Sequence, residues 1–111
     1  MPRHASILAS NVNLIFRYRF FVPNDRLRDA VSSHVSRLLK EEREKQKLSL
    51  NALAQKAGLA RQTVAFIERE VQSPSFDTLL RIAFALDIRI ENVIARAHRY
   101  AKKESASRIL R

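Results

Sequence analysis

The sequence contains no cysteine, no tryptophan and only one glycine in 111 residues. Without cysteine there is no disulfide, no thiolate metal site and no cysteine nucleophile, which suits a reducing compartment. A single glycine excludes the usual glycine-rich loops that bind phosphate groups. Long apolar runs are also missing, because Arg17 and Arg19 interrupt the only candidate and no run approaches the roughly 20 residues that span a bilayer. We therefore expect a soluble, cytoplasmic protein that binds no membrane and needs no cofactor.

Acidic residues are few in comparison with basic ones. The chain has 21 Lys and Arg against 11 Asp and Glu, a formal net charge of +10 and a pI near 11.1. The excess is greatest at the C-terminal end, where residues 97–111 carry five basic side chains and one acidic side chain. A chain of this charge is expected to bind a polyanion, although charge alone does not separate nucleic acid from an anionic membrane.

Side chains that serve in catalysis form no recognisable pattern in this sequence. His4, His34 and His98 are far apart and lack the paired spacing of metal ligands. We expect no catalytic residue and no metal site, and therefore no enzyme.

Residues 1–23 differ from the rest of the chain and form an expected N-terminal extension. From Val12 to Val22 every second residue is apolar or aromatic, which is the period of a β-strand. A lone strand is unstable and the sequence offers no second one. The segment would therefore pair with the same strand of a second subunit, or with a strand of another protein. The alternative is that residues 1–23 are a disordered leader or a misassigned start.

Helical periodicity governs the remainder and predicts an all-α domain over residues 24–97. We expect five helices, over residues 24–47, 50–57, 60–70, 76–86 and from 90 to beyond 97. Residues 98–111 then form a basic, helical C-terminal extension that frays toward its end.

The ends of these helices carry recognisable signals. Pro23 is expected to close the N-terminal extension, so that Asn24 caps the first helix. Ser49 and Ser75 are the expected N-caps of the second and fourth helices. Gly58 is expected to turn the chain after the second helix, because glycine adopts the left-handed conformation at least steric cost.

Four short motifs occur in order within residues 48–94. They are LSxxxLAxKAGL at 48–59, TVxxIE at 63–68, SPSFDTLLRIAFAL at 73–86 and IRIENVI at 88–94. With this order and spacing, residues 37–94 resemble the Cro and phage-repressor type of helix-turn-helix domain, also called xenobiotic-response-element-like. The resemblance covers about half of the chain and implies a five-helix, DNA-binding fold.

The resemblance implies that the helix over residues 60–70 reads DNA bases in the major groove. The family's base-reading positions fall here on Arg61, Gln62, Thr63 and Phe66. Arginine can bond guanine, glutamine can bond adenine, and threonine or phenylalanine can contact a thymine methyl. Two of these residues have an alternative role: Arg61 could contact a phosphate, and Phe66 could be a core residue.

Contacts with the DNA backbone are also implied by the resemblance. They fall here on Ser49, Arg69, Gln72 and Ser73. Leu50 departs from the family's common glutamine, whereas Glu70 and Asp87 stand where many relatives carry glycine. Glu70 is therefore expected to bring a negative charge toward DNA, and the basic flanks to add affinity through counterion release. Glu68 is implied to be structural, holding the recognition helix.

Relatives in this family usually form dimers through their last helices. The corresponding residues here are Val93, Ala97, Tyr100 and Ala101, unless they pack on the chain's own first helix. We therefore expect a sequence-specific transcriptional regulator, a homodimeric repressor that binds double-stranded DNA. An alternative from another class is an antitoxin, which binds a toxin protein through residues 12–22 as well as its own promoter. A third is a helix-turn-helix module used only for protein association.

Overall fold

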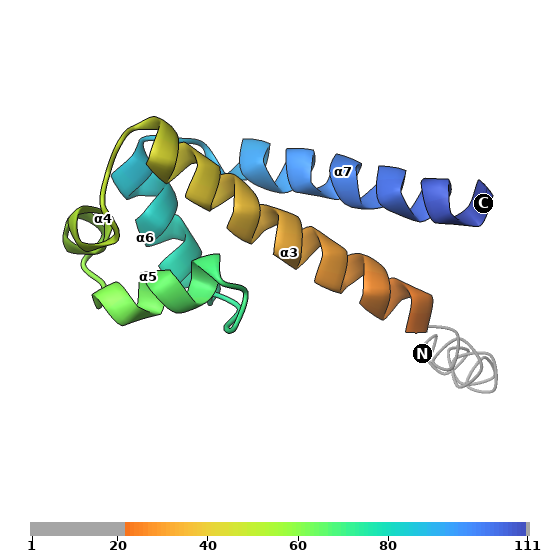
Figure 1. Ribbon diagram of the computed structural model, residues 1–111, viewed down its shortest axis with the longest axis horizontal. Helices are drawn as coiled ribbons and strands as arrows, with labels where there is room; N and C mark the ends of the chain where they lie inside the picture. The colour runs from red at the N-terminus through yellow and green to blue at the C-terminus, as the bar shows by residue number, and fades with distance from the viewer. Residues whose placement is uncertain (1–21, 111) are drawn as a thin grey trace, which may run out of the picture.

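The computed structural model describes the backbone of residues 22–110 and the side chains of residues 25–107. In this part of the chain there are five helices and no strand, which confirms the all-α prediction (Figure 1). They are α3 (Val22–Lys45), α4 (Leu50–Ala57), α5 (Arg61–Glu68), α6 (Phe76–Leu86) and α7 (Ile90–Leu110). None of these helices is both long and apolar enough to cross a membrane.

The expected strand over residues 12–22 lies outside the described residues, apart from Val22. That residue is the first of α3, with Pro23 and Asn24 following in the first turn. The expected N-cap at Asn24 is therefore wrong. A proline is tolerated in the first turn, because the N–H it lacks has no partner within the helix. The antitoxin alternative depended on the same segment and stays a prediction.

Three of the expected helix ends are confirmed. The Oγ of Ser49 accepts a hydrogen bond from the backbone N–H of Ala52 at 3.0 Å. The Oγ of Ser75 accepts one from the N–H of Thr78 at 3.1 Å. Gly58 is left-handed, with φ 70°, directly after α4.

Helix α5, which the resemblance implies to be the recognition helix, is shorter than the expected span of residues 60–70. It begins at Arg61 and ends at Glu68, since Ala60 has an extended backbone and Arg69 has left the helical conformation. Glu70 is left-handed, with φ 62°, and turns the chain toward the next helix.

Helices α5 and α6 pack against α3, α4 packs on α5 and α6, and α7 runs back along α3 in the opposite direction (Figure 1). We call the pair of α3 and α7 the arm. Six large side chains are almost completely buried: Leu39, Leu53, Val64, Ile67, Ile82 and Leu86. Each contributes about 1.5–3 kcal/mol relative to an exposed position. The core thus fixes α5 against α3 and α4.

The inward face of α7 is already covered within the single chain. Val93, Ala97 and Ala101 are buried, and α7 packs mainly on α3. Tyr100, by contrast, is 39 % exposed. Packing on the chain's own first helix is therefore present, and three of the four expected dimer residues have almost no surface to offer. The helix also runs unbroken across the boundary expected at residues 97 and 98.

Candidate nucleic-acid interface

Helix α5 has one apolar face and one polar face. Val64 and Ile67 point into the core and are almost completely buried. Arg61 and Gln62, in the first turn, are exposed, and Thr63 is half-buried. The side chains at the N-terminal turn are therefore free to meet a ligand, while the opposite face is fixed by the core. This is the arrangement that a helix needs in order to enter a major groove.

An open groove of about 720 Å³ lies along α5 and is built from three helices. Its lining residues are Lys40, Arg43, Glu44, Leu50, Arg61, Gln62, Ala65, Phe66, Glu68 and Arg69. Three of the four expected base-reading residues line it, and Thr63 does not. Among the described residues, Lys40, Arg61 and Arg69 have no acidic partner. The groove therefore presents uncompensated positive charge beside α5.

Lys40 is a groove residue that the sequence interpretation missed. It belongs to a mixed-charge stretch of α3 that has the pattern of a solvated helix face. Only the packing of α3 beside α5 brings it to the groove, and no local pattern signals that packing.

Phe66 belongs to the surface of α5 and not to the core. It is half-buried, lines the groove and is absent from the core cluster. The guanidinium carbon of Arg69 lies 5.3 Å from the centre of its ring. Such a cation–π contact contributes about 0.5–1 kcal/mol at an exposed site. The two side chains therefore hold each other in place on the groove side of α5.

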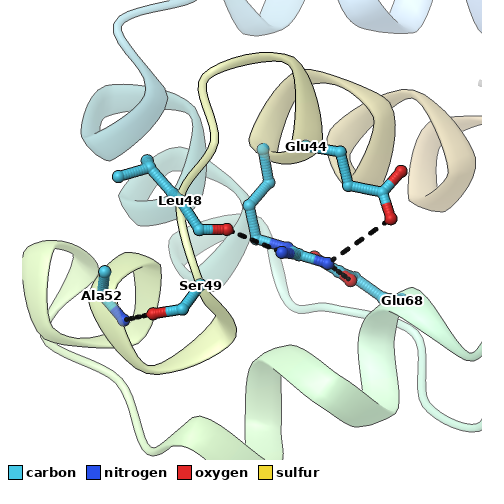
Figure 2. Close-up of polar contacts among 6 residues, drawn as sticks. Glu44, Leu48, Ser49, Ala52 and Glu68 are labelled. Carbon is cyan, nitrogen blue, oxygen red and sulfur yellow. Dashed lines mark hydrogen bonds and ion pairs between the residues drawn. The ribbon is translucent and has the colours of Figure 1, made fainter.

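The C-terminal end of α5 is tied to α3 by a buried ion pair between Arg43 and Glu68. Arg43 Nε and Nη2 donate to the two carboxylate oxygens of Glu68, at 2.7 Å and 2.9 Å (Figure 2). A third N–H of Arg43 donates to the carbonyl of Leu48 at 2.7 Å. The hydrogen bonds to Glu68 hold the pKa of Arg43 above its ordinary value. The structural role expected for Glu68 is confirmed.

The carboxylate of Glu70 is bonded to two side chains of α3. Its carboxylate accepts hydrogen bonds from Ser33 Oγ and from Arg37 Nε, the latter at 3.4 Å, and both donors belong to α3. Arg37 also donates to Ser33 Oγ at 3.0 Å. The negative charge is thus bonded to the arm and faces a positive side chain there. The charge of Glu70 is therefore partly offset within the chain, and its expected position toward DNA stays a prediction.

The expected backbone-contact residues lie on two separate elements. Ser49 precedes α4, and its hydroxyl oxygen is used as a cap while its proton is free to be donated. Arg69, Gln72 and Ser73 follow α5 and are exposed, and the Oγ of Ser73 lies 3.4 Å from that of Ser32. Their contacts with DNA stay predictions. Leu50 packs against the core, which accounts for its departure from a polar residue.

Comparison with protein families identifies the domain that contains this groove. The sequence model of the family described as Helix-turn-helix, of Cro/repressor type, matches residues 39–92. This chain carries a Cro/repressor-type helix-turn-helix domain. The match runs from the last two turns of α3 to the start of α7, so the helix-turn-helix domain includes all of α4, α5 and α6. No curated protein and no solved structure matches the chain.

The family is one of DNA-binding regulatory domains and not of enzymes. The chain is accordingly a DNA-binding transcriptional regulator. Most of the arm lies outside the matched helix-turn-helix domain, including the first seventeen described residues of α3 (22–38) and α7 from Val93 onward.

Proposed function

We propose that this helix-turn-helix protein is a sequence-specific repressor that binds double-stranded DNA with α5 in the major groove. The observation that carries the proposal is the exposure of Arg61 and Gln62 beside a groove that contains Lys40 and Arg69 without acidic partners. A reading helix needs polar side chains at its first turn and a rigid support behind it. The buried Arg43–Glu68 ion pair supplies part of that support.

The side chains of α5 suit specific bases. Arg61 has the donors for guanine O6 and N7, and Gln62 has the donor and acceptor for adenine N6 and N7. Phe66 has no hydrogen-bonding group, so the thymine methyl is the feature of the major groove that it recognises. Thr63 can contact the same methyl. Lys40 and Arg69 are proposed to contact phosphates and so to add affinity without sequence preference.

We further propose that the protein binds as a homodimer to an operator with two half-sites. In that arrangement the two recognition helices lie about 34–36 Å apart, one turn of DNA. Among the expected interface residues Tyr100 alone has substantial surface in the single chain, so the dimer must use other residues beside it.

The test is selection of bound duplexes from random DNA, followed by variants on the selected sequence. Arg61→Ala and Gln62→Ala are each expected to lose about 1–3 kcal/mol, or about 5- to 150-fold in affinity. Arg26→Ala removes the same charge from an exposed position of α3 and is expected to have little effect. Lys40→Ala is expected to weaken all sequences alike and to reduce the slope of log affinity against log salt by about one.

Several results would contradict the proposal. Selection without a consensus would reduce the protein to a nonspecific DNA binder. An equal loss with Arg61→Ala and Arg26→Ala would show that Arg61 contributes only net charge. A consensus without twofold symmetry, with one protein per duplex in light scattering, would exclude the homodimer while leaving base reading intact.

A further inference from the structure

The arm carries an apolar groove that is separate from α5. It has a volume of about 540 Å³, and its apolar lining includes Leu27 and Val31 of α3, Leu79 of α6 and Ile94 of α7. Pro74, in the segment before α6, closes one side. None of the residues of the recognition helix lines it. This groove does not belong to the DNA-reading surface.

At this groove, side chains that pack against the hydrophobic core are partly exposed to solvent. Val31 and Leu79 are half-buried and pack against the core cluster, while Ile94 is 38 % exposed. Contiguous apolar patches on soluble proteins are usually covered, because their exposure to water is unfavourable. Five of the nine lining residues precede the part of α3 that matches the family: Leu27, Arg28, Val31, Ser32 and Val35. The groove is therefore a feature of this chain beyond the helix-turn-helix domain.

We propose that residues 14–20 of the same chain occupy this groove, with Leu14, Phe16, Tyr18 and Phe20 directed into it. These residues lie outside the described part of the structure, and their sequence and their position just before α3 support this placement. In an extended segment, alternation would place these four side chains on one side and Ile15, Arg17 and Arg19 on the other. One fully apolar side and one side with two arginines suit a segment that lies in a surface groove.

The position and length of the segment fit the groove. Residue 20 comes two positions before Val22, where the described part of α3 begins, and α3 forms one wall of the groove. Seven extended residues span about 23 Å. From Val22 to Val35, the last α3 residue in the lining, the helix rises about 20 Å. After a reversal at residue 21 the segment is long enough to reach the far end of the groove.

An acidic side chain near the groove and the short tether both favour residues 14–20 of the same chain over those of a second copy as the occupant. The hollow next to the groove shares Ser32 with it and contains Asp29, which has no ion pair among the described residues and can pair with Arg17 or Arg19. A short tether gives an effective concentration of about millimolar. A second copy at micromolar concentration is therefore outcompeted for the same groove.

Disulfide trapping tests the proposal cleanly, because the full chain has no cysteine of its own. One variant combines Leu14→Cys with Ile94→Cys, a groove residue. The matched control combines Leu14→Cys with Arg96→Cys, which lies on the same helix at nearly the same tether length but outside the lining. In dilute protein with oxidised glutathione as the oxidant, the Ile94→Cys variant is expected to form an intramolecular disulfide at least tenfold faster, measured as loss of free thiols without a dimer band on a nonreducing gel.

Each other outcome overturns the proposal. Equal rates in the two variants would show that the segment does not prefer the groove. Disulfide-linked dimers with Ile94→Cys would assign the groove to the segment of a second copy.

A second set of variants separates docking from chance collision. Adding Phe16→Asp and Phe20→Asp is expected to abolish the preference for Ile94→Cys, whereas Ile15→Asp, on the other side of the segment, leaves it unchanged. A preference that survives both aspartates would also overturn the proposal. The helical circular dichroism of each variant shows whether α3 to α7 stay folded. None of these measurements uses DNA, so the result is independent of the proposed repressor function.

Discussion

Replacing Glu68 with glutamine is expected to lower the free energy of unfolding by about 3–5 kcal/mol, the cost of breaking a buried ion pair by removing one partner. The side chains of Arg43 and Glu68 are 12 % and 6 % exposed, so little water is available to replace the lost charge. Glu68→Gln keeps the shape but offers one acceptor where Arg43 now has two, at 2.7 Å and 2.9 Å. Arg43 would stay charged, with the Leu48 carbonyl and the single amide oxygen of the glutamine as its remaining acceptors. A loss of this size is a large part of the 5–15 kcal/mol that stabilises a typical domain.

Urea unfolding followed by helical circular dichroism measures the loss. The matched control is Glu44→Gln, since Glu44 also approaches Arg43, at 3.9 Å, but is 57 % exposed. Its expected cost is below about 1 kcal/mol. Comparable costs for the two variants, or a cost below about 1 kcal/mol for Glu68→Gln, would refute the burial argument. The double variant Arg43→Met with Glu68→Leu is expected to lose less than the sum of the single losses, because it leaves no buried charge unpaired.

Four further outcomes are expected. Gly58→Ala costs about 1–2 kcal/mol in urea unfolding, because its φ of 70° strains any side chain. Asp87→Gly, at φ 57°, is neutral or stabilising by up to about 1 kcal/mol in the same assay. Ser75→Ala costs about 1 kcal/mol through the lost cap. The hydrogen bond from Arg96 lowers the pKa of Tyr100, so absorbance titration, with the other tyrosine changed to phenylalanine, gives a value below about 10 that rises in Arg96→Ala. Because this pKa is lowered on folding, the ionised tyrosine stabilises the fold above its unfolded pKa, and the gain is lost as pH falls through the folded value.

Local signals in the sequence predicted most helix ends, because caps depend on neighbours along the chain. Ser49, Gly58 and Ser75 act within four residues of their partners. The start of α3 was not predicted, since Pro23 suits both the end of an extended segment and the first turn of a helix. Nothing in the adjacent residues separates these two readings.

The candidate site was predicted only as far as it depends on one helix. The exposed and buried faces of α5 follow from its periodicity, so Arg61 and Gln62 were placed on the correct side. The partners of Glu68 and Glu70 were not predicted, because Arg43 and Arg37 are 25 and 33 positions away and meet them only through packing. Likewise, periodicity shows that one face of α7 is covered, but not whether α3 or a second copy covers it.

The helices α3, α4, α5 and α6 end in the same kind of left-handed turn, and only one of these four turns uses glycine. Each helix is followed by a left-handed residue: Lys47, Gly58, Glu70 and Asp87. In every case this residue donates its N–H three positions back, and the next residue donates five positions back. These are the two bonds of a Schellman motif, and the next residue is apolar each time: Leu48, Leu59, Val71 and Ile88.

Apolar packing holds three of these motifs, and polar contacts hold the fourth. Leu48, Leu59 and Ile88 pack against the core, which offsets the strain of a left-handed backbone. Val71, after the recognition helix, is 67 % exposed and gives no such support. In the turn after α5, the hydrogen bonds from Ser33 and Arg37 to Glu70 offset the strain of the left-handed backbone instead. The glutamate that replaces the family's usual glycine therefore ties the turn after α5 to the arm, so that α3 fixes both the end of the reading helix and the loop that follows it.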